Sequence, residues 1–238
     1  MDFETMSNCN RACPTCIRNS HPDREAVKSW FGNNYLPEEI IFEALEQAIE
    51  MGFAGDVCLS HFNEPLMDER LPEIARSIKE YDHFRMVFLN TNGDYITSEL
   101  AERLDGKLDR MIVTLYMGEP IKSQRAECIP SLFKKTKIQI ITESEHIPSH
   151  FSPKFPVKEL AEKYHESNCV EPAMRIIINH RRQYLLCCED VIGNFDLGYF
   201  PDTPLREFWF GRHAEIQNTL AERGGRHWHP YCETCPKS

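Results

Sequence analysis

Three cysteines near the N-terminus constrain this chain more than any other feature. Cys9, Cys13 and Cys16 are spaced C-x3-C-x2-C within residues 7–16, a stretch that we expect to be a loop. Thiolates are soft ligands that suit zinc or iron–sulfur clusters. A [4Fe–4S] cluster usually takes four cysteines, so three would leave one iron open to a small molecule. The alternative is a structural zinc site completed by His21, although zinc sites more often pair two C-x2-C motifs.

A second set of cysteines lies in the C-terminal third of the chain. Cys232 and Cys235 form a C-x2-C pair, which is a strong metal-ligand spacing. Cys169 precedes a predicted hairpin and Cys187 lies on its second arm, so a compact fold can bring four thiolates together. Residue type alone leaves zinc and an iron–sulfur cluster almost equal here. Neighbouring strand residues face opposite sides, so only one of Cys187 and Cys188 should be a ligand, and we expect Cys187.

The composition excludes several classes of protein. A net charge of −10 over 238 residues argues against a non-specific nucleic-acid surface, which needs clustered positive charge. No apolar run is long enough to span a bilayer, so we expect no membrane partner. The acidic N-terminus, Met1-Asp2-Phe3-Glu4, has no signal-peptide core, which predicts a cytoplasmic protein. The ten cysteines should then stay reduced, which favours metal or cluster ligation over disulfides.

The first 150 residues alternate between strand-like and helix-like segments. We predict strands at 2–6, 56–60, 86–89, 110–115 and 137–141, and helices at 40–51, 71–81 and 97–104. This alternation predicts βα units and a parallel sheet. Five or six units are too few for a closed eight-unit barrel. The predicted fold class is therefore α/β, a partial (β/α)6 TIM-like barrel over residues 1–150.

Polar segments follow several of these strands. The cysteine loop, Asn63-Glu64-Pro65 and Thr91-Asn92-Gly93 each come directly after one. Parallel sheets place their ligand sites at the carboxyl ends of strands. We therefore expect the three segments to share one face of the sheet.

The composition changes at residues 147–156, where three prolines predict a connector. Beyond it, strand-like runs at 174–179 and 183–188 predict a β-hairpin. Residues 205–223 read as one amphipathic helix that ends at Gly224-Gly225. The second predicted domain, residues 151–238, is thus a small α+β cap built from a hairpin and a helix.

Taken together, the motifs resemble the radical SAM superfamily, in which S-adenosylmethionine (SAM) binds the open iron. The segment His61-Phe62-Asn63-Glu64-Pro65-Leu66 is similar to the Gly-Glu-Pro motif of these enzymes. The C-terminal cysteines, with Leu186-Cys187-Cys188-Glu189-Asp190 and Leu205-Arg206-Glu207-Phe208-Trp209, resemble a Twitch cap, a short relative of the SPASM domain. Within the superfamily, the chain is similar to the 2-deoxy-scyllo-inosamine dehydrogenases, which share its short length and single auxiliary cluster.

The resemblance implies two [4Fe–4S] clusters and SAM as cofactors. The N-terminal cysteines would hold the SAM-binding cluster, and the auxiliary cluster would be held by the cap cysteines Cys169, Cys187, Cys232 and Cys235. Glu64 would accept hydrogen bonds from the methionyl ammonium of SAM. Asn63 replaces the usual glycine beside it, and Thr114 matches a position that contacts the SAM ribose or carboxylate. Gly118-Glu119-Pro120 has the more usual spelling of the motif but follows the fourth strand, so we prefer Glu64.

The resemblance also implies the chemistry. SAM is cleaved reductively to a 5′-deoxyadenosyl radical, which abstracts hydrogen from a small-molecule substrate, and an electron donor such as flavodoxin or ferredoxin supplies the electron. A two-electron oxidation follows if the auxiliary cluster accepts an electron from the substrate radical. Our candidates for substrate contact are Glu189, Asn90 and Phe62. Two alternatives stay open: a radical SAM enzyme that crosslinks or epimerises a peptide, and a non-catalytic zinc protein.

Overall fold

The chain folds into two compact units. The computed structural model describes residues 1–116, 118–142, 151 and 157–237. One unit consists of Met1–Cys9 and Asn33–His146, and the other of Asn10–Gly32 and Ile147–Ser238. The segment Asn10–Gly32, which we expected in the first domain, groups with the C-terminal part. The assignment of residues 1–150 and 151–238 to a barrel and a cluster cap stays a prediction.

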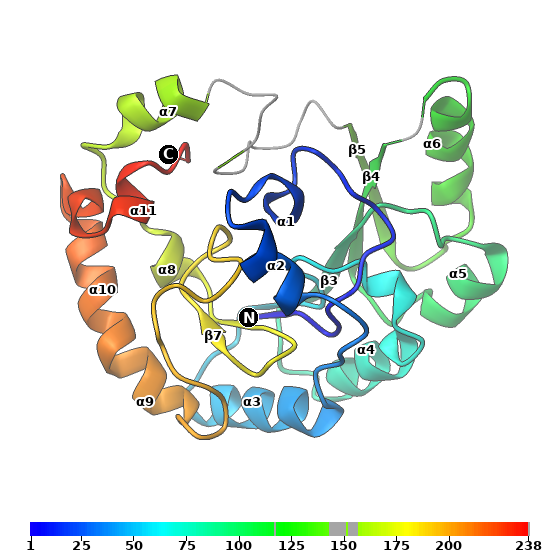
Figure 1. The fold of residues 1–238 in the computed structure, drawn as a ribbon. Coiled ribbons are helices and arrows are strands. Elements are labelled where there is room, and N and C mark those ends of the chain that lie inside the picture. The colour runs from blue at the N-terminus through cyan, green and yellow to red at the C-terminus, as the bar shows by residue number, and fades with distance from the viewer. Residues whose placement is uncertain (117, 143–150, 152–156, 238) are drawn as a thin grey trace. The chain divides into compact units, whose positions relative to one another are not determined.

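The first unit contains a parallel five-stranded sheet (Figure 1). Its strands are β1 (Asp2–Phe3), β2 (Asp56–Cys58), β3 (Met86–Thr91), β4 (Arg110–Leu115) and β5 (Lys137–Thr142). Their spatial order is β5-β4-β3-β2-β1, and every neighbouring pair is parallel. The sheet is open, because β1 and β5 do not pair with each other. The predicted α/β class and open, barrel-like sheet are confirmed.

Helices connect these strands. They are α3 (Glu38–Glu50), η1 (Pro65–Met67), α4 (Leu71–Glu80), α5 (Ser98–Leu104) and α6 (Ile121–Ser131). The α4 helix buries Leu71, Ile74, Ala75 and Ile78, the spacing of one helical face, and in Figure 1 it lies beside β3. Each fully buried aliphatic side chain contributes roughly 1.5–3 kcal/mol. Three of the helices match our predictions to within two residues, and α6 was not predicted.

The second unit has short elements. They are α1 (Ile17–Ser20), α2 (Arg24–Trp30), α7 (Val157–Tyr164), α8 (Glu171–Met174), β6 (Ile177–Ile178), β7 (Tyr184–Leu185), α9 (Leu205–Phe210), α10 (Arg212–Ala221), η3 (Gly225–Trp228) and α11 (Pro230–Glu233). The predicted hairpin is present as the antiparallel pair β6–β7. Its strands are shorter than predicted, because residues 171–174 are helical and Arg182 turns the chain with a φ of 66°.

The single helix predicted at 205–223 is wrong, because the chain breaks between α9 and α10. Gly211 has φ −92° and ψ −130°, and it serves as the C-cap of α9 and the N-cap of α10. A Cβ atom at this position would lie 2.5 Å from the carbonyl oxygen of Glu207. A residue with a Cβ atom would clash there, so the position requires glycine. The apolar spacing continues across Gly211, and it therefore does not show where the helix breaks.

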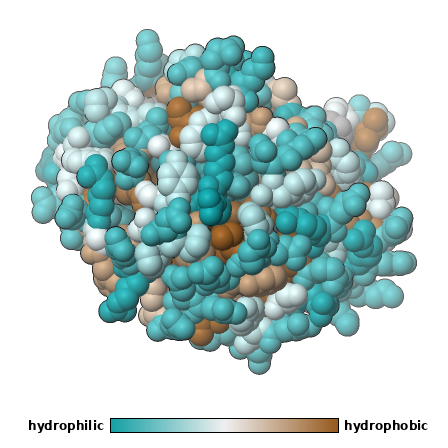
Figure 2. All heavy atoms as spheres, turned by 60° about the horizontal axis from the view of Figure 1, so that its bottom comes forward, coloured by the Kyte–Doolittle hydropathy of each residue, from teal (hydrophilic) through white to brown (hydrophobic). Residues whose placement is uncertain are grey.

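One face of the protein is largely polar. Figure 2 shows a face on which hydrophilic side chains predominate and apolar ones form small separate patches. Within the described residues, no helix combines the length and the apolar character needed to cross a membrane. The predicted connector at 147–156 lies outside the described residues, except for Phe151.

Candidate active site and cysteine centres

Glu64 joins the carboxyl ends of the first unit's strands. Its carboxylate accepts hydrogen bonds from the Thr91 hydroxyl (2.5 Å) and the Asn92 backbone N–H (2.7 Å), both at the end of β3. It also accepts the Leu66 N–H at 3.1 Å, which starts helix η1. Pro65 occupies the first turn of η1, where the missing N–H costs nothing. The loop after β2 is therefore tied to the end of β3 through one carboxylate.

This carboxylate is buried without a cation. Glu64 is 2% exposed, and none of the ion pairs among the described residues involves it. Burial raises the pKa of the Glu64 carboxyl, and the hydrogen bonds from Thr91, Asn92 and Leu66 act against that rise. Buried charges in proteins are normally paired. A cationic group such as an ammonium would therefore be stabilised beside Glu64.

The start of the cysteine loop lies against the Glu64 backbone. The Glu64 N–H donates to the Asn8 carbonyl at 2.9 Å, and the Asn8 side chain accepts the Cys9 N–H at 2.8 Å. Arg70 supports the same strand exit, because it donates to the Thr5 carbonyl (3.1 Å) and pairs with Asp68. Cys9 and Glu64 thus belong to one hydrogen-bonded corner of the first unit.

The other two N-terminal cysteines belong to the second unit. Cys13 and Cys16 form a turn in which the Cys16 N–H donates to the Cys13 carbonyl at 3.1 Å, and α1 begins directly after Cys16. His21, the residue considered for a zinc site, accepts the Asp23 N–H on Nδ1 and packs edge-on against Phe151.

The predicted cofactor contacts Thr114 and Asn63 lie at strand ends. Thr114 is buried near the end of β4, one residue before the strand finishes. The Asn63 side chain accepts the His61 N–H at 2.9 Å and donates to the Thr5 hydroxyl at 3.4 Å. That amide therefore shapes its own loop, and cofactor contact by Asn63 or Thr114 stays a prediction.

The candidates for substrate contact in the first unit are also at strand ends. The side-chain amide of Asn90, an exposed residue of β3, donates to Ser60 Oγ at 3.3 Å. Phe62 is half-buried and packs against the ring of His61, with 4.1 Å between the ring centroids. Both residues are on the predicted face, and their contact with a substrate stays a prediction.

In the second unit, the four predicted cap cysteines line one cavity. Cys169, Cys187, Cys232 and Cys235 line a cavity of about 30 Å³, together with Leu186, Leu220, Arg226 and Tyr231. Cys188 is not among the lining residues. Its sulfur accepts a hydrogen bond from Lys237 at 3.3 Å and lies 3.8 Å from a carboxylate oxygen of Glu171.

The donor set of this cavity fits a soft metal centre. Burial raises the pKa of the Cys232 and Cys235 thiols to about 12, so thiolates there require a positively charged partner. The buried Arg226 lines the same cavity, and its Nε has no hydrogen-bond partner among the described residues. The cavity thus holds four thiols beside a buried N–H that lacks an acceptor.

The spacing of the sulfurs bears on which metal the cavity could hold. Four thiolates around one zinc ion, at about 2.3 Å each, lie about 3.8 Å apart. Among the described residues, no three of the four cap sulfurs lie within 4.8 Å of one another. As they are placed, the sulfurs would have to move closer together to bind a single zinc ion.

Glu189 lies in the wall of this cavity. Its carboxylate pairs with Lys237 at 2.7 Å, and its carbonyl accepts the Tyr231 hydroxyl at 2.6 Å. Glu189 is 3% exposed. Its contacts with Lys237 and Tyr231 connect residues 231–237 to the hairpin. Its predicted contact with a substrate is not tested by this geometry.

Several residues of these sites were not predicted from the sequence. Thr91 and Asn92 were placed on the right face, but not as partners of Glu64. No local pattern predicts the contacts of Arg226 and Lys237 with the cysteine segments, because folding brings these residues together. The one clue in the sequence is that Lys237, a basic residue, follows Cys235 by two positions.

A Radical SAM superfamily sequence model matches residues 3–128, which include the cysteine loop, Glu64 and strands β2–β4. The chain belongs to the radical SAM superfamily. Its cofactors therefore include SAM and a [4Fe–4S] cluster.

Among individual proteins, the chain is similar to the S-adenosyl-L-methionine-dependent 2-deoxy-scyllo-inosamine dehydrogenase of Niallia circulans. The two are 21% identical over 236 residues, which cover 99% of this chain and 91% of the relative. The structure of BtrN in complex with AdoMet and 2-DOIA matches with a TM-score of 0.80 at 20% identity, covering 99% and 92% of the two chains. The structure of anSMEcpe with AdoMet and the Cp18Cys peptide matches with a TM-score of 0.61 at 12% identity, covering 99% and 87%. These structural likenesses show a shared fold.

Proposed function

We propose that this radical SAM enzyme dehydrogenates a small hydroxyl-bearing substrate, of the class of amine-bearing cyclitols. The observation that carries the proposal is the near end-to-end match with a dehydrogenase of that class, over 99% of this chain and 91% of the relative. When bound, SAM and the reduced cluster would supply a radical able to remove one hydrogen atom from a carbon of the substrate. A proton and one electron must then leave to complete the oxidation.

In this proposal the chain's own residues bind and orient. Cys9, Cys13 and Cys16 hold the SAM-binding cluster. Glu64 accepts the methionyl ammonium of SAM, which gives its buried carboxylate the cation that the described residues do not supply. The Thr91 hydroxyl and Asn92 N–H fix that carboxylate, so it is oriented before the ligand arrives.

We further propose that Cys169, Cys187, Cys232 and Cys235 hold an auxiliary [4Fe–4S] cluster. The support is their common cavity, the C-x2-C spacing of Cys232 and Cys235, and the membership of the chain in a superfamily that uses iron–sulfur clusters. A cluster with four protein thiolates has no open iron, so it cannot bind the substrate directly, and we propose that it accepts the substrate's electron. That electron balances the one spent on cleaving SAM, so flavodoxin or ferredoxin would supply the first electron and turnover would consume no further net electrons.

A second function is favoured by one observation, the fold shared with anSMEcpe, whose structure contains a peptide. In that case the chain would modify a peptide side chain. The dehydrogenase reading has the stronger support, because the TM-score of 0.80 to BtrN exceeds the 0.61 to anSMEcpe.

The test is the mass of the product. Anaerobically reconstituted enzyme is supplied with SAM, a flavodoxin reducing system and 2-deoxy-scyllo-inosamine or related aminocyclitols. We expect a product lighter by two hydrogens and one SAM cleaved per product. Product of unchanged mass, or turnover of peptides only, would contradict the proposal. Enzyme with Cys9, Cys13 and Cys16 changed to Ala is the inactive control.

A further inference from the structure

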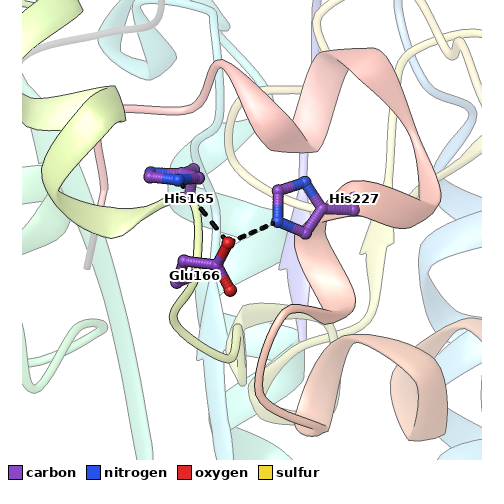
Figure 3. Close-up of side chains that lie close together, drawn as sticks. All are labelled: His165, Glu166 and His227. Carbon is purple, nitrogen blue, oxygen red and sulfur yellow. Dashed lines mark hydrogen bonds and ion pairs between the residues drawn. The ribbon is translucent and has the colours of Figure 1, made fainter.

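Two histidines and a glutamate gather in the second unit, apart from the cysteine cavity. His165 and Glu166 follow helix α7, and His227 lies on η3. Figure 3 shows both imidazole rings facing the Glu166 carboxylate. Glu166 Oε1 lies 3.1 Å from His227 Nε2 and 3.6 Å from His165 Nε2. The three ligand atoms all lie within 4.8 Å of one another.

Both rings are held so that Nε2 points inward. His165 Nδ1 lies 2.5 Å from the Glu162 carbonyl, and His227 Nδ1 lies 3.0 Å from a carboxylate oxygen of Glu233. Metal-binding histidines almost always donate their second ring N–H to such a carbonyl or carboxylate, which fixes the tautomer and the ring. Two independent acceptors in this arrangement point to a ligand at Nε2.

The distances suit one small ion. Nitrogen and oxygen ligands at about 2.0–2.1 Å from a tetrahedral zinc lie about 3.3 Å apart. The two measured Glu166–histidine distances, 3.1 and 3.6 Å, bracket this value. The ligand atoms of the two histidines lie within 4.8 Å of each other. All three side chains are between 39% and 57% exposed, so an ion can reach them.

We propose that His165, Glu166 and His227 bind one Zn²⁺ ion, with Glu233 as the outer partner of His227. Imidazole nitrogen and carboxylate oxygen are ligands that zinc prefers, and three protein ligands leave a fourth position for water. In the metal-free protein, Glu166 bridges the two rings. An exposed ion pair of this kind stabilises a protein by only about 0–1 kcal/mol. The pairing with Glu166 is therefore too weak to explain why both rings are held in one orientation.

The position of the site gives the ion a structural role. The segment around Glu166 is already bonded to the segment around Gly224, with the Gly224 N–H 3.0 Å from the Glu166 carbonyl. The first segment leads to Cys169, whose N–H donates to the Leu220 carbonyl, and the second leads to Cys232 and Cys235. Zinc would therefore clamp together the two chain segments that carry three of the cap cysteines.

The experiment uses the cluster-loaded protein, dialysed against low concentrations of Zn²⁺ without strong chelator. Zinc, iron and sulfide are measured on the same samples, and thermal unfolding is followed with and without zinc. We expect one zinc per chain in the wild type with unchanged iron, and a raised melting temperature. His165→Gln, His227→Gln and Glu166→Gln should each lose the zinc and the thermal shift.

Two further variants make the test specific. Glu233→Gln removes only the outer carboxylate, and we expect zinc affinity to fall roughly 10- to 100-fold. Glu162→Gln changes a nearby charge but leaves the backbone carbonyl, so it should bind zinc normally. Zinc retained by the His165 and His227 variants, or zinc taken up only as iron is lost, would overturn the proposal.

Discussion

At the scale of single residues, Glu64 does two tasks. It accepts hydrogen bonds from backbone and hydroxyl donors at two strand ends, and it places a buried carboxyl group at the carboxyl edge of the sheet, with no ion-pair partner among the described residues. We preferred this residue to Glu119 because Glu64 follows an earlier strand, although Gly118-Glu119-Pro120 matches the Gly-Glu-Pro motif more closely. Glu119 is exposed and bonds only locally, to Ser123, so it has none of these features.

Changing Glu64 to Gln tests whether this residue binds SAM or is only an acidic residue of the loop. The amide would turn an N–H₂ group toward donors that now meet a carboxylate, and the ammonium of SAM would lose its charged partner. We expect SAM affinity to fall roughly 10- to 100-fold, the equivalent of about 1.5–3 kcal/mol for a charged hydrogen bond. Equilibrium dialysis with labelled SAM measures this. Glu119→Gln is the matched control and should bind like wild type; equal losses in both would contradict our assignment.

The neighbouring cysteines 187 and 188 offer a second test at this scale. Cys187 lines the cap cavity, whereas Cys188 contacts Lys237 outside it. We expect Cys188→Ser to keep the iron and sulfide content of wild type, because serine can still accept from Lys237. Cys187→Ser should lose or weaken one cluster. Iron analysis and electron paramagnetic resonance of the reduced proteins decide, and the reverse pattern would show that Cys188 is the ligand.

Residue-scale prediction is possible where spacing along the chain carries the chemistry. The cysteine motifs and Asn63-Glu64-Pro65 are local patterns, and the superfamily that they predicted is confirmed, whereas their individual roles stay predictions. The buried pair of Glu189 with Lys237 joins residues 48 positions apart, so no local pattern predicts it. Contact of Glu189 with a substrate also stays a prediction.

At the scale of elements, hydrophobic period predicted the long helices and central strands well. β4 was predicted at its observed bounds, because its six residues form a continuous strand-like run that is mostly apolar and mostly buried. Short elements escaped, since α8 and α11 have four residues each and show no period. The break at Gly211 escaped for a different reason, because it depends on a steric clash with Glu207 rather than on polarity.

Helix α10 carries a histidine whose titration should affect stability. His213 is 1% exposed, stacks on Phe208, and has Nδ1 2.9 Å from the Gln217 amide. Burial lowers the pKa of His213 from 6.5 to about 4. The unfolded chain therefore binds a proton below pH 6.5 that the folded chain refuses, so stability is lost as the pH falls from 6.5 towards 4.

Replacing His213 by Leu should remove this part of the pH dependence. The wild type should lose up to about 3 kcal/mol between pH 6.5 and 4 from this group, at about 1.4 kcal/mol per pKa unit. The variant should lose less over the same range, which urea unfolding at several pH values measures. Gln217→Met removes the hydrogen bond but keeps the histidine, and it should keep the wild-type slope. Parallel pH profiles for wild type and His213→Leu would refute the assignment.

At the scale of the whole molecule, the sequence predicted two parts that divide near residue 150, and this division into a barrel and a cap stays a prediction. The sequence did not predict that Asn10–Gly32 would group with the C-terminal part. This grouping depends on contacts between distant residues, such as the Arg181 guanidinium over the Trp30 ring at 4.3 Å. No local pattern encodes such a contact, so the cysteine motif is contiguous in sequence but shared between two units.

This division bears on how the two proposed clusters depend on each other. Cys13 and Cys16 fold with the second unit, yet the four cap cysteines line a separate cavity that includes neither of them. Changing Cys9, Cys13 and Cys16 together to Ala should therefore remove one cluster and leave the other. We expect about four irons per chain in place of about eight, with no reductive cleavage of SAM.

The reciprocal variant changes the cap cysteines and leaves the N-terminal ones. With Cys232 and Cys235 changed to Ala, the auxiliary cluster should be lost, while the SAM-binding cluster and SAM cleavage remain, because no cap cysteine belongs to the N-terminal set. Oxidation of the substrate should then fail, since the electron left on it has no acceptor. Iron analysis, 5′-deoxyadenosine release and product mass are measured on both variants. Loss of both clusters in either one would show that the two centres form a single cooperative structure, and SAM cleavage by the N-terminal variant would remove the basis of the mechanism.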